Sequence, residues 1–514
     1  MATSTSRWWA LGALVLSVLV IGMDATILNV ALPTLAADLH ATTRDLQWIV
    51  DAYMVPFAAL MLPAGAFGDR FGRRRLLLAG LAAFAVASVV ATAAGGTGQL
   101  IAARALMGAG GALIMPLSTS ILPVIFPPAE RGRAIAAWTA AVALGLPLGP
   151  IVGGYLLDHF RWGSIFLINI PVVVVAALVT AVFVPESRDP SASRLDSPGA
   201  LLSVAGLAAL VFGIIEAPSK GWGDPAVLAG LGAGVVLLTA FALVEARGPA
   251  AMVDLRLFRS RVFVWGAVGA TFVSLGMAGV LFVVPQHLQA VLGYDALGTG
   301  IRVIPMVAGL MAGGLAGERL TARLGLRALM TAGLVILAAG FLLGATTGPA
   351  SGYGLTAAWL AVAGAGTGLA MVPAMDGVLA TLPEERTGSG SATLQTVRQV
   401  GATMGVAVLG SLLSAVYVAR LPEGVPAPAG DSVTAAVEVA ARTGNADLLR
   451  AAREAFVGAM DQVLLVCGVA SVLAAVLVVV FLTRATGTAA VPAVQTAQSG
   501  HDHTAAPRPH SPLP

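Results

Sequence analysis

Residues 9–32 read WALGALVLSVLVIGMDATILNVAL and contain one ionisable side chain, Asp24. A helix of about 20 apolar residues is long enough to cross the hydrocarbon core of a bilayer. Similar apolar stretches recur along most of the chain, with polar segments between them. We therefore expect an all-α integral membrane protein in which each long apolar stretch forms one membrane-spanning helix.

The overall composition supports the same conclusion. Of the 514 residues, 57% are hydrophobic and only 11% are charged, and the mean hydropathy is +0.89. A soluble domain carries about 25% charged residues. Because so few charged residues cannot cover a surface that faces water, most of the outer surface of this protein must face lipid.

Fourteen stretches are long and apolar enough to span a membrane. They cover residues 9–32, 47–67, 76–95, 99–123, 134–156, 163–184, 198–217, 226–245, 262–284, 297–317, 328–346, 355–380, 392–417 and 458–482. Residues 419–457 form the longest external loop, in which Val433 to Arg453 could include a short surface helix. Residues 485–514 are rich in Ala, Pro, Thr and His, a composition typical of a disordered tail.

Basic residues are distributed unevenly between the two sides of these spans. If the N-terminus is cytoplasmic, the inner segments and inner helix ends hold twenty arginines, and the outer segments hold seven basic residues. Cytoplasmic segments of membrane proteins retain the excess of positive charge. We therefore expect a multi-pass protein of the plasma membrane (the inner membrane of a bacterium) with both termini in the cytoplasm.

The chain contains a weak internal repeat. Residues 108–110 (GAG) precede Glu130-Arg131, and residues 364–366 (GAG) precede Glu385-Arg386; the distances from the first Gly to the Arg are 23 and 22 residues. Secondary transporters are often built from repeated halves and bind substrate at the membrane midplane between them. The alternative is chance similarity in a chain rich in Gly and Ala.

Three carboxylates in the spans are candidate sites for proton coupling and substrate binding. Asp24 lies inside the first span, where a low dielectric favours the neutral acid, so it either exchanges protons or forms a structural pair with an arginine. Asp51 begins the second span and is either solvated or functional. Asp376 follows Pro373, where a helix break frees backbone groups to line a cavity. Three acidic residues favour a cationic substrate or a proton over an anion.

Arg104 is the basic residue inside the fourth span. Its guanidinium stays protonated in proteins, so it cannot carry a transported proton. It can favour the charged form of a nearby carboxylate in one conformation, or it can form a structural ion pair.

The segment after the second span reads GAFGDRFGRRR at residues 65–75. Its glycines permit a tight turn between packed helices, and Asp69 could pair with an arginine or a helix N-terminus and so hold one conformational state. Residues 323–327 (RLGLR) keep a partial copy that lacks the acidic residue. The predicted switch residues are Gly65, Asp69, Arg70, Gly72, Arg73 and Arg74.

Glycines recur every four residues in the fifth span. Residues at this spacing share one face of a helix, and small residues there permit close helix packing. Two prolines in the same stretch favour a bend. Such a face suits either a helix that slides against its neighbour or a static contact. The residues concerned are Gly145, Pro147, Gly149, Pro150, Gly153 and Gly154.

Several motifs are missing from the sequence. It contains no GxxxxGK[ST] phosphate-binding loop and no HExxH motif, and Cys467 is its single cysteine. We therefore expect no enzymatic activity, no cofactor and no metal site. His501 and His503 could bind a metal weakly, but their position in the tail favours simple disorder.

Together these motifs resemble the major facilitator superfamily, and within it the fourteen-spanner drug:proton antiporter-2 family. Residues 65–75 look like its motif A, the surroundings of Arg104 like motif B, residues 145–154 like motif C and residues 23–33 like motif D. One branch of that family carries acidic residues in span 13. Residues 392–417 contain none, which weighs against divalent cations as substrates.

The resemblance implies a fold and a mode of action. The expected fold has two six-helix bundles at 1–184 and 262–484, and two inserted helices within 185–261. The resemblance also implies alternating access and export of a lipophilic, cationic drug or antibiotic coupled to proton entry. The expected partners are the small-molecule substrate, protons and the lipid bilayer; we expect a monomer that binds no nucleic acid.

Two other functions remain open at this stage. The protein could be a dedicated exporter of one endogenous metabolite, which the sequence does not distinguish from a multidrug exporter. It could also be a membrane scaffold or receptor that transports nothing, although Asp24 and Arg104 inside the membrane favour transport.

Overall fold

The computed structural model describes residues 4–188, 196–247, 255–379 and 384–482, so the tail at 485–514 lies outside the described residues. Within these ranges the regular secondary structure is helical, without strands. The first half contains α1 (Ser4–Asp38), α2 (Thr43–Phe71), α3 (Arg73–Thr92), α4 (Thr97–Ile125), α5 (Pro128–His159), α6 (Ser164–Leu167) and α7 (Asn169–Phe183).

The remaining helices follow in chain order. They are α8 (Ser197–Lys220), α9 (Pro225–Arg247), η1 (Leu255–Arg259), α10 (Arg261–Gln286), η2 (His287–Val291), α11 (Ala296–Arg302), α12 (Ile304–Gly344), α13 (Tyr353–Leu379), α14 (Glu384–Arg420), α15 (Ala427–Asp431), α16 (Val433–Thr443) and α17 (Ala446–Phe481).

The number of membrane spans agrees with the prediction. Thirteen helices of the described chain are long and apolar enough to cross a membrane, and the bent pair Thr43–Met61 and Pro63–Phe71 supplies the fourteenth. The two parts of α2 meet at 56°. Pro63 accounts for this bend because it lacks an amide donor and its ring clashes with the preceding turn. The all-α membrane fold is thus confirmed.

Two glycines mark corresponding turns in the two halves. Gly72 has a φ of 111° between α2 and α3, and Gly325 has a φ of 76° where α12 bends between its two spans. L-residues with a side chain rarely adopt such angles, so glycine is required at both turns. The partial copy of the basic loop at 323–327 therefore lies at a turn equivalent to that of residues 65–75.

The last helix begins earlier than expected. We expected the final span to start near residue 458, but α17 starts at Ala446, where the Asn445 side chain accepts a hydrogen bond from the Leu448 amide. Its first turns are rich in Ala, Leu and Arg, which are strong helix formers. The external segment at 419–457 is therefore more helical than expected: α16 begins where the short surface helix was expected, α15 precedes it, and the start of α17 follows it.

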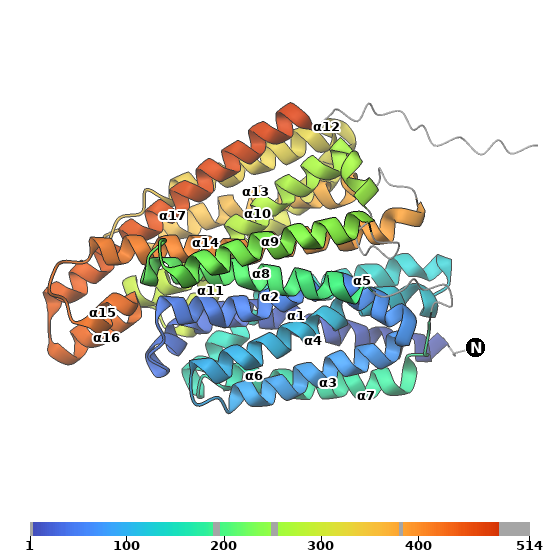
Figure 1. Cartoon of the computed structure of the whole chain (residues 1–514), viewed down its shortest axis with the longest axis horizontal. Coiled ribbons are helices and arrows are strands. Elements are labelled where there is room, and N and C mark those ends of the chain that lie inside the picture. Colours follow the sequence, from blue (N-terminus) through green and yellow to red (C-terminus); the bar gives the residue numbers. More distant parts are fainter. Residues whose placement is uncertain (1–3, 189–195, 248–254, 380–383, 483–514) are drawn as a thin grey trace, which may run out of the picture.

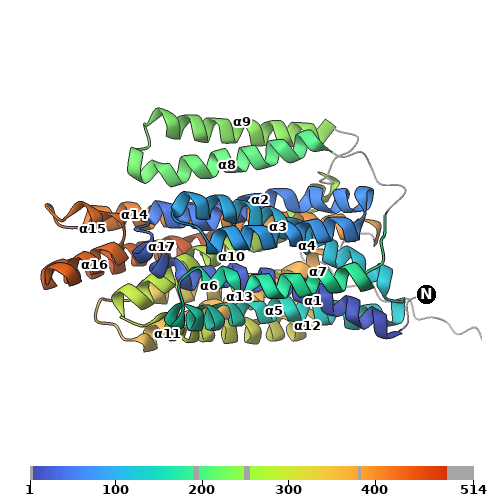
Figure 2. The same cartoon turned by 90° about the horizontal axis from the view of Figure 1, so that it is seen from below.

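The helices pack as two groups with a peripheral pair (Figures 1 and 2). In the first group, α1 packs on α5 and α7, and α4 packs on α2 and α3; in the second, α12 packs on α13 and α17, and α10 packs on α14. Figure 2 shows α8 and α9 at one side, where α8 contacts both α2 and α14. We call the end of the molecule that carries α15 and α16 the α16 end, and the opposite end the N-terminal end.

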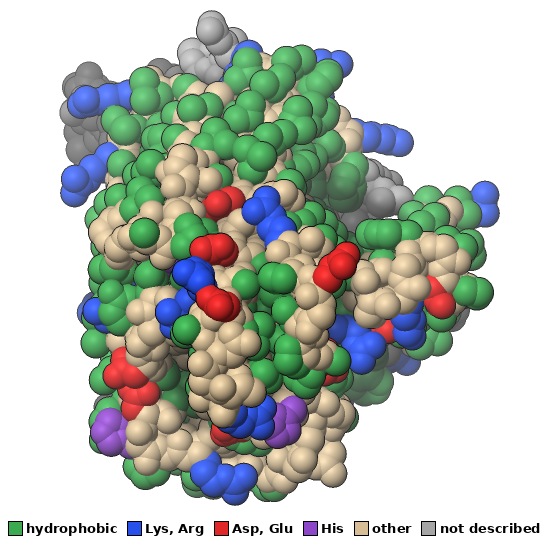
Figure 3. Space-filling view, turned by 90° about the vertical axis from the view of Figure 1, so that its left-hand side faces the viewer, with side chains coloured by type: hydrophobic (Ala, Val, Ile, Leu, Met, Phe, Trp, Pro, Cys, Tyr) green, Lys and Arg blue, Asp and Glu red, His purple; other side chains and the backbone are tan. Residues whose placement is uncertain are grey.

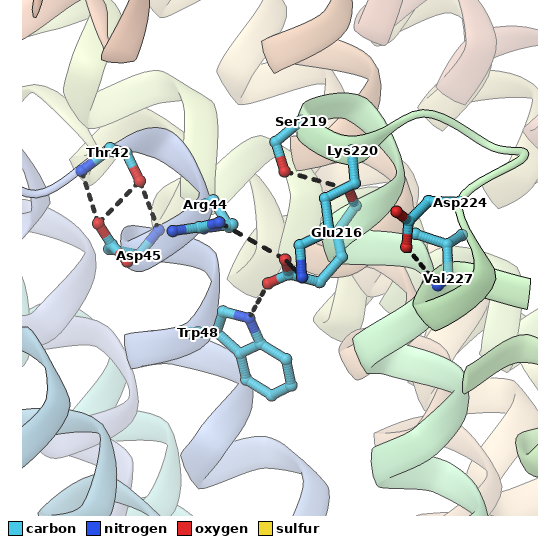
Figure 4. A network of polar contacts seen from close by, with 9 residues as sticks. All are labelled: Thr42, Arg44, Asp45, Trp48, Glu216, Ser219, Lys220, Asp224 and Val227. Atoms are coloured by element: carbon cyan, nitrogen blue, oxygen red, sulfur yellow. Dashed lines mark hydrogen bonds and ion pairs between the residues drawn. The ribbon is translucent and has the colours of Figure 1, made fainter. Parts of the chain in front are cut away.

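A polar cluster attaches α8 to α2 near the α16 end (Figure 4). The Glu216 carboxylate accepts hydrogen bonds from Arg44 at 3.5 Å and from the Trp48 indole at 3.4 Å, and it pairs with Lys220 at 3.1 Å. The Ser411 hydroxyl of α14 donates to the Ile214 carbonyl at 2.9 Å. Through α8, the peripheral pair is therefore bonded to both halves.

The Gly72 turn gives a direct test of this fold. We expect Gly72→Ala to destabilise the protein by about 1–3 kcal/mol, because of the positive φ and because a Cβ there would lie 2.6 Å from the Glu186 carboxylate. Gly65→Ala is a matched control, since no atom lies within 4 Å of its added Cβ. Thermal unfolding in detergent, followed with a thiol-reactive dye at the buried Cys467, measures the difference. Equal melting temperatures for the two variants would contradict the assigned turn.

Candidate functional site

A buried ion pair lies at the centre of the first half. Arg104 of α4 donates from Nη1 to Oδ2 of Asp24 on α1 at 2.6 Å, and the two side chains are 2% and 0% exposed. The Asn169 side-chain amide of α7 donates to the other carboxylate oxygen at 3.0 Å. Three helices therefore satisfy a carboxylate that would be costly to bury alone.

Two contacts from α2 hold the guanidinium of Arg104 in place. Its Nε donates to the Ile49 carbonyl at 3.2 Å, and its Cζ lies 4.2 Å from the centre of the Tyr53 ring. Gly108 allows α4 to approach α2 this closely, because a Cβ there would lie 2.9 Å from the Tyr53 carbonyl carbon. Of the predicted polar residues, the structure thus brings Asp24 and Arg104 together.

Asp51 lies elsewhere on α2. Ile49 and Tyr53 contact Arg104, and Asp51 comes two residues from each, so helical geometry places it on another face. Its neighbours on that face, Trp48 and Val55, pack with α8 and α14. Asp51 is completely buried, and among the described residues neither of its carboxylate oxygens has a hydrogen-bond partner. The solvated position considered for Asp51 is therefore not what the structure shows.

Asp376 lies in α13, three residues after Pro373. Its side chain is outside the described part of the structure, so its role remains a prediction.

A cavity of about 510 Å³ lies between the two halves of the molecule. The first half contributes Thr26, Tyr53 and Arg104, and the second contributes Thr367, Arg398 and Gln399. Much of the remaining wall is apolar, with Val, Leu, Ile, Met and Phe side chains. Pockets of this size and character accept drug-sized ligands.

The glycine face of α5 brings this helix against α1, beside the ion pair. A Cβ at Gly145 would lie 2.9 Å from the Gly22 Cα, and one at Gly149 would lie 2.7 Å from the Met23 carbonyl oxygen. The Thr26 hydroxyl donates to the Gly145 carbonyl at 3.4 Å. The position of Asp24 in α1 therefore depends on the absence of side chains at these positions.

The two halves are hydrogen-bonded to each other at the α16 end, which Figure 3 shows face-on with acidic and basic side chains interspersed. The Asp158 carboxylate of α5 accepts from the amides of Ala296 and Leu297 in α11 at 3.2 and 3.0 Å. Gly154 and Gly300 permit this approach: a Cβ at Gly154 would lie 2.6 Å from the Ala296 carbonyl oxygen, and one at Gly300 would lie 2.6 Å from the Pro150 carbonyl carbon. Gly153 instead packs on Ile27 of α1.

Two further bonds join the halves at the same end. The Gln47 side chain of α2 donates to the Ala407 carbonyl of α14 at 3.0 Å. The Gln289 side chain of η2 donates to the Val30 carbonyl of α1 at 2.9 Å. These contacts must break if the cavity is to open toward the α16 end.

The basic loop lies at the N-terminal end. Asp69 pairs with Arg73 at 2.7 Å, and Arg73 also donates to the Ser120 carbonyl of α4 at 3.1 Å. Of the two partners considered for Asp69, the structure shows an arginine, which is also the first residue of α3. Arg74 donates to the Val184 carbonyl at 3.3 Å, and Arg70 lies over the Phe71 ring.

Three polar residues of these sites were not selected from the sequence. Asn169 bonds to Asp24, Glu186 accepts the Arg74 amide at 3.2 Å, and Arg398 lines the cavity. Asn169 and Arg398 each interrupt an apolar span, and a polar residue inside a span was the available signal. The sequence around Glu186 gives no sign of its role, because its partner Arg74 lies in a turn that is distant along the chain.

Two groups of packed membrane helices with a cavity between them are the architecture of a secondary transporter. The Major Facilitator Superfamily matches residues 14–406, which is well over half of the chain. The chain belongs to this family.

Its relatives include efflux proteins. The chain is 36% identical to the multidrug efflux pump LfrA of Mycolicibacterium smegmatis over 466 residues, which are 88% of this chain and 92% of LfrA. It is 33% identical to the tetracenomycin C resistance and export protein of Streptomyces glaucescens (85% and 82% covered). It is also 33% identical to the methyl viologen resistance protein SmvA of Salmonella typhimurium (88% and 93% covered).

Solved structures show the same fold. A bacterial homologue of the human lysosomal transporter Spinster, crystallised in an inward-facing and unoccupied conformation, matches with a TM-score of 0.67 and 17% identity. The match covers 94% of this chain and 98% of that chain. The family and the fold are thus those of a multi-pass membrane transporter.

A double-mutant cycle tests the central ion pair. We expect Arg104→Gln to destabilise the protein by about 3–5 kcal/mol, because it leaves the buried Asp24 carboxylate without its cation. Adding Asp24→Asn should recover a large part of that loss. The free energy of unfolding, from denaturant titration in detergent, gives a coupling energy on the order of 1–3 kcal/mol. Strictly additive effects would mean that the two side chains do not interact.

Proposed function

We propose that this protein exports lipophilic small molecules across the plasma membrane in exchange for protons. The proposal rests mainly on the apolar cavity between the two halves. Arg104 lines this cavity and pairs with Asp24 behind its wall. Hydrogen bonds at the α16 end join the two halves. The efflux relatives support the same function. Export by alternating access follows if the cavity opens in turn to each side of the membrane.

The orientation is also part of the proposal. The excess of arginine in the inner segments favours a cytoplasmic N-terminal end, with both termini inside. The α16 end would then face outward, and this structure would represent the state closed to the outside. Substrate would enter from the cytoplasm or the inner leaflet.

The two buried carboxylates take different roles in this proposal. Asp24 accepts hydrogen bonds from both Arg104 and Asn169, so its carboxylate is compensated within the first half. Asp51 has no hydrogen-bond donor among the described residues, and an isolated buried carboxylate is so costly that the neutral acid is the stable form. Asp51 therefore carries a proton in this state. Proton release to the inside would make Asp51 charged and drive its surroundings to rearrange.

Substrate-driven proton release tests the coupling. In inverted membrane vesicles acidified by respiration, a transported dye such as ethidium should release protons from the lumen. We expect Asp24→Asn to abolish this release, because Arg104 then loses the carboxylate that compensates its buried charge. Asp447→Asn, an exposed position at the start of α17, is the control and should behave as wild type. Normal release in Asp24→Asn would rule out this coupling site.

A dedicated exporter of one endogenous metabolite is the second candidate. Two relatives favour this function. One is the tetracenomycin C resistance and export protein, and the other is a probable actinorhodin transporter from Streptomyces coelicolor (35% identical).

A substrate panel distinguishes the two candidates. Cells that express the protein should export several chemically unrelated lipophilic dyes and drugs if it is a multidrug pump, because its largely apolar cavity makes few directional contacts. Export should stop when a protonophore collapses the proton gradient. Efflux of a single compound would favour the dedicated exporter, and efflux that survives the protonophore would contradict proton coupling.

A further inference from the structure

The central cavity carries a positive charge that no described carboxylate balances. Arg104 and Arg398 are the charged residues among its described lining. Asp24 neutralises Arg104 from behind the cavity wall at 2.6 Å. Among the described residues, Arg398 has no ion-pair partner; its recorded contacts are with Gln395 and Met375.

The guanidinium of Arg398 is only partly used. Its Nη1 donates to the Gln395 side-chain oxygen at 2.6 Å and lies 3.6 Å from the Met375 sulfur. Its Nε is buried and has no hydrogen-bond partner among the described residues. The Nε donor is therefore unused, and a guanidinium can bind a carboxylate with two parallel hydrogen bonds.

Three other arginines of the described chain are compensated. Arg73 and Arg104 each pair with a carboxylate, and Arg302 lies 3.5 Å from the centre of one tyrosine ring and 5.2 Å from another. A purely structural Arg398 should show a similar partner, because an isolated guanidinium is costly away from water. A charged residue that faces a cavity at membrane depth more often belongs to the path of a substrate.

We propose that Arg398 binds an acidic group of the substrate, so that the cavity takes lipophilic anions and zwitterions that carry a carboxylate or an ionised phenol. This inference rests on the proposed function and specifies its substrate class. Gln399 lines the same cavity and its side-chain amide can donate to the acidic group, while the apolar walls hold the rest of the molecule.

The predicted preference for cations was based on three carboxylates, and the proposed role of Arg398 runs against it. Asp24 and Asp51 are not among the lining residues of the cavity. Asp376 follows Met375 on α13, and its side chain lies outside the described residues. The charge preference of the cavity is therefore tested by comparing the binding of charged and esterified substrates to the wild-type protein.

Rhodamine B and its ethyl ester form a matched pair of probes, since they share one ring system and differ in whether the carboxylate is free. Binding of each to the purified full chain in detergent is measured by fluorescence anisotropy. We expect wild type to bind the free acid about tenfold more tightly than the ester, as one charge-assisted hydrogen-bonded contact would give. Arg398→Gln should remove this advantage and leave the ester affinity unchanged.

Two further variants separate charge from folding. Arg398→Lys keeps the positive charge and should keep part of the preference for the acid, which a merely structural role would not predict. Arg442→Gln changes an arginine of α16 whose side chain is 63% exposed, and it should behave as wild type. Equal affinity of wild type for the two dyes, or an equal loss for both dyes in Arg398→Gln, would overturn the inference.

Transport of the same dyes distinguishes this inference from the proposed function. Proton-driven efflux of the ester without any preference for the acid would refute the role of Arg398 and leave the exporter intact. If proton gradients drive efflux of neither dye nor of any compound in the drug panel, both proposals fail.

Discussion

A carboxylate in the interior of a membrane protein must be balanced, and in this chain the balance for Asp24 comes from Arg104 at 2.6 Å. Each partner belongs to a different helix, and Asn169 adds a third. The approach of α4 to α2 at Gly108, and of α5 to α1 at Gly145 and Gly149, holds the helices that carry these groups. Burial of the charges in the first half therefore depends on the close packing of its helices.

The same packing connects the ion pair to the contacts between the halves. Helix α1 carries Asp24, lies on the glycine face of α5, and accepts a hydrogen bond from η2 at Val30. Helix α5 in turn holds α11 through Asp158. A shift of α1 on the smooth face of α5 would therefore alter both the partner of Asp24 and the contacts at the α16 end. This arrangement offers a physical route by which protonation could control which side of the membrane the cavity faces.

Much of the fold could be predicted from the sequence, because membrane helices can be recognised by their length and apolar composition. Gly72 could be predicted to form a turn, and the glycine spacing at 145–153 to form a packed face, since both depend on local geometry. The orientation of Asp51 could not be predicted from its neighbourhood in the sequence, because it depends on where α8 and α14 pack. The significance of Arg398 likewise depends on a cavity assembled from both halves.

We propose that, in this state, Asp51 holds a proton while Asp24 is paired with Arg104. Infrared difference spectroscopy of the purified protein in lipid tests it most directly, because the carbonyl stretch of a protonated carboxyl is separate from the carboxylate bands. As the pH is raised through the range in which transport occurs, a protonated carboxyl band should disappear. This band should be missing in Asp51→Asn and present in Asp24→Asn. A band that is missing in Asp24→Asn and retained in Asp51→Asn would contradict it.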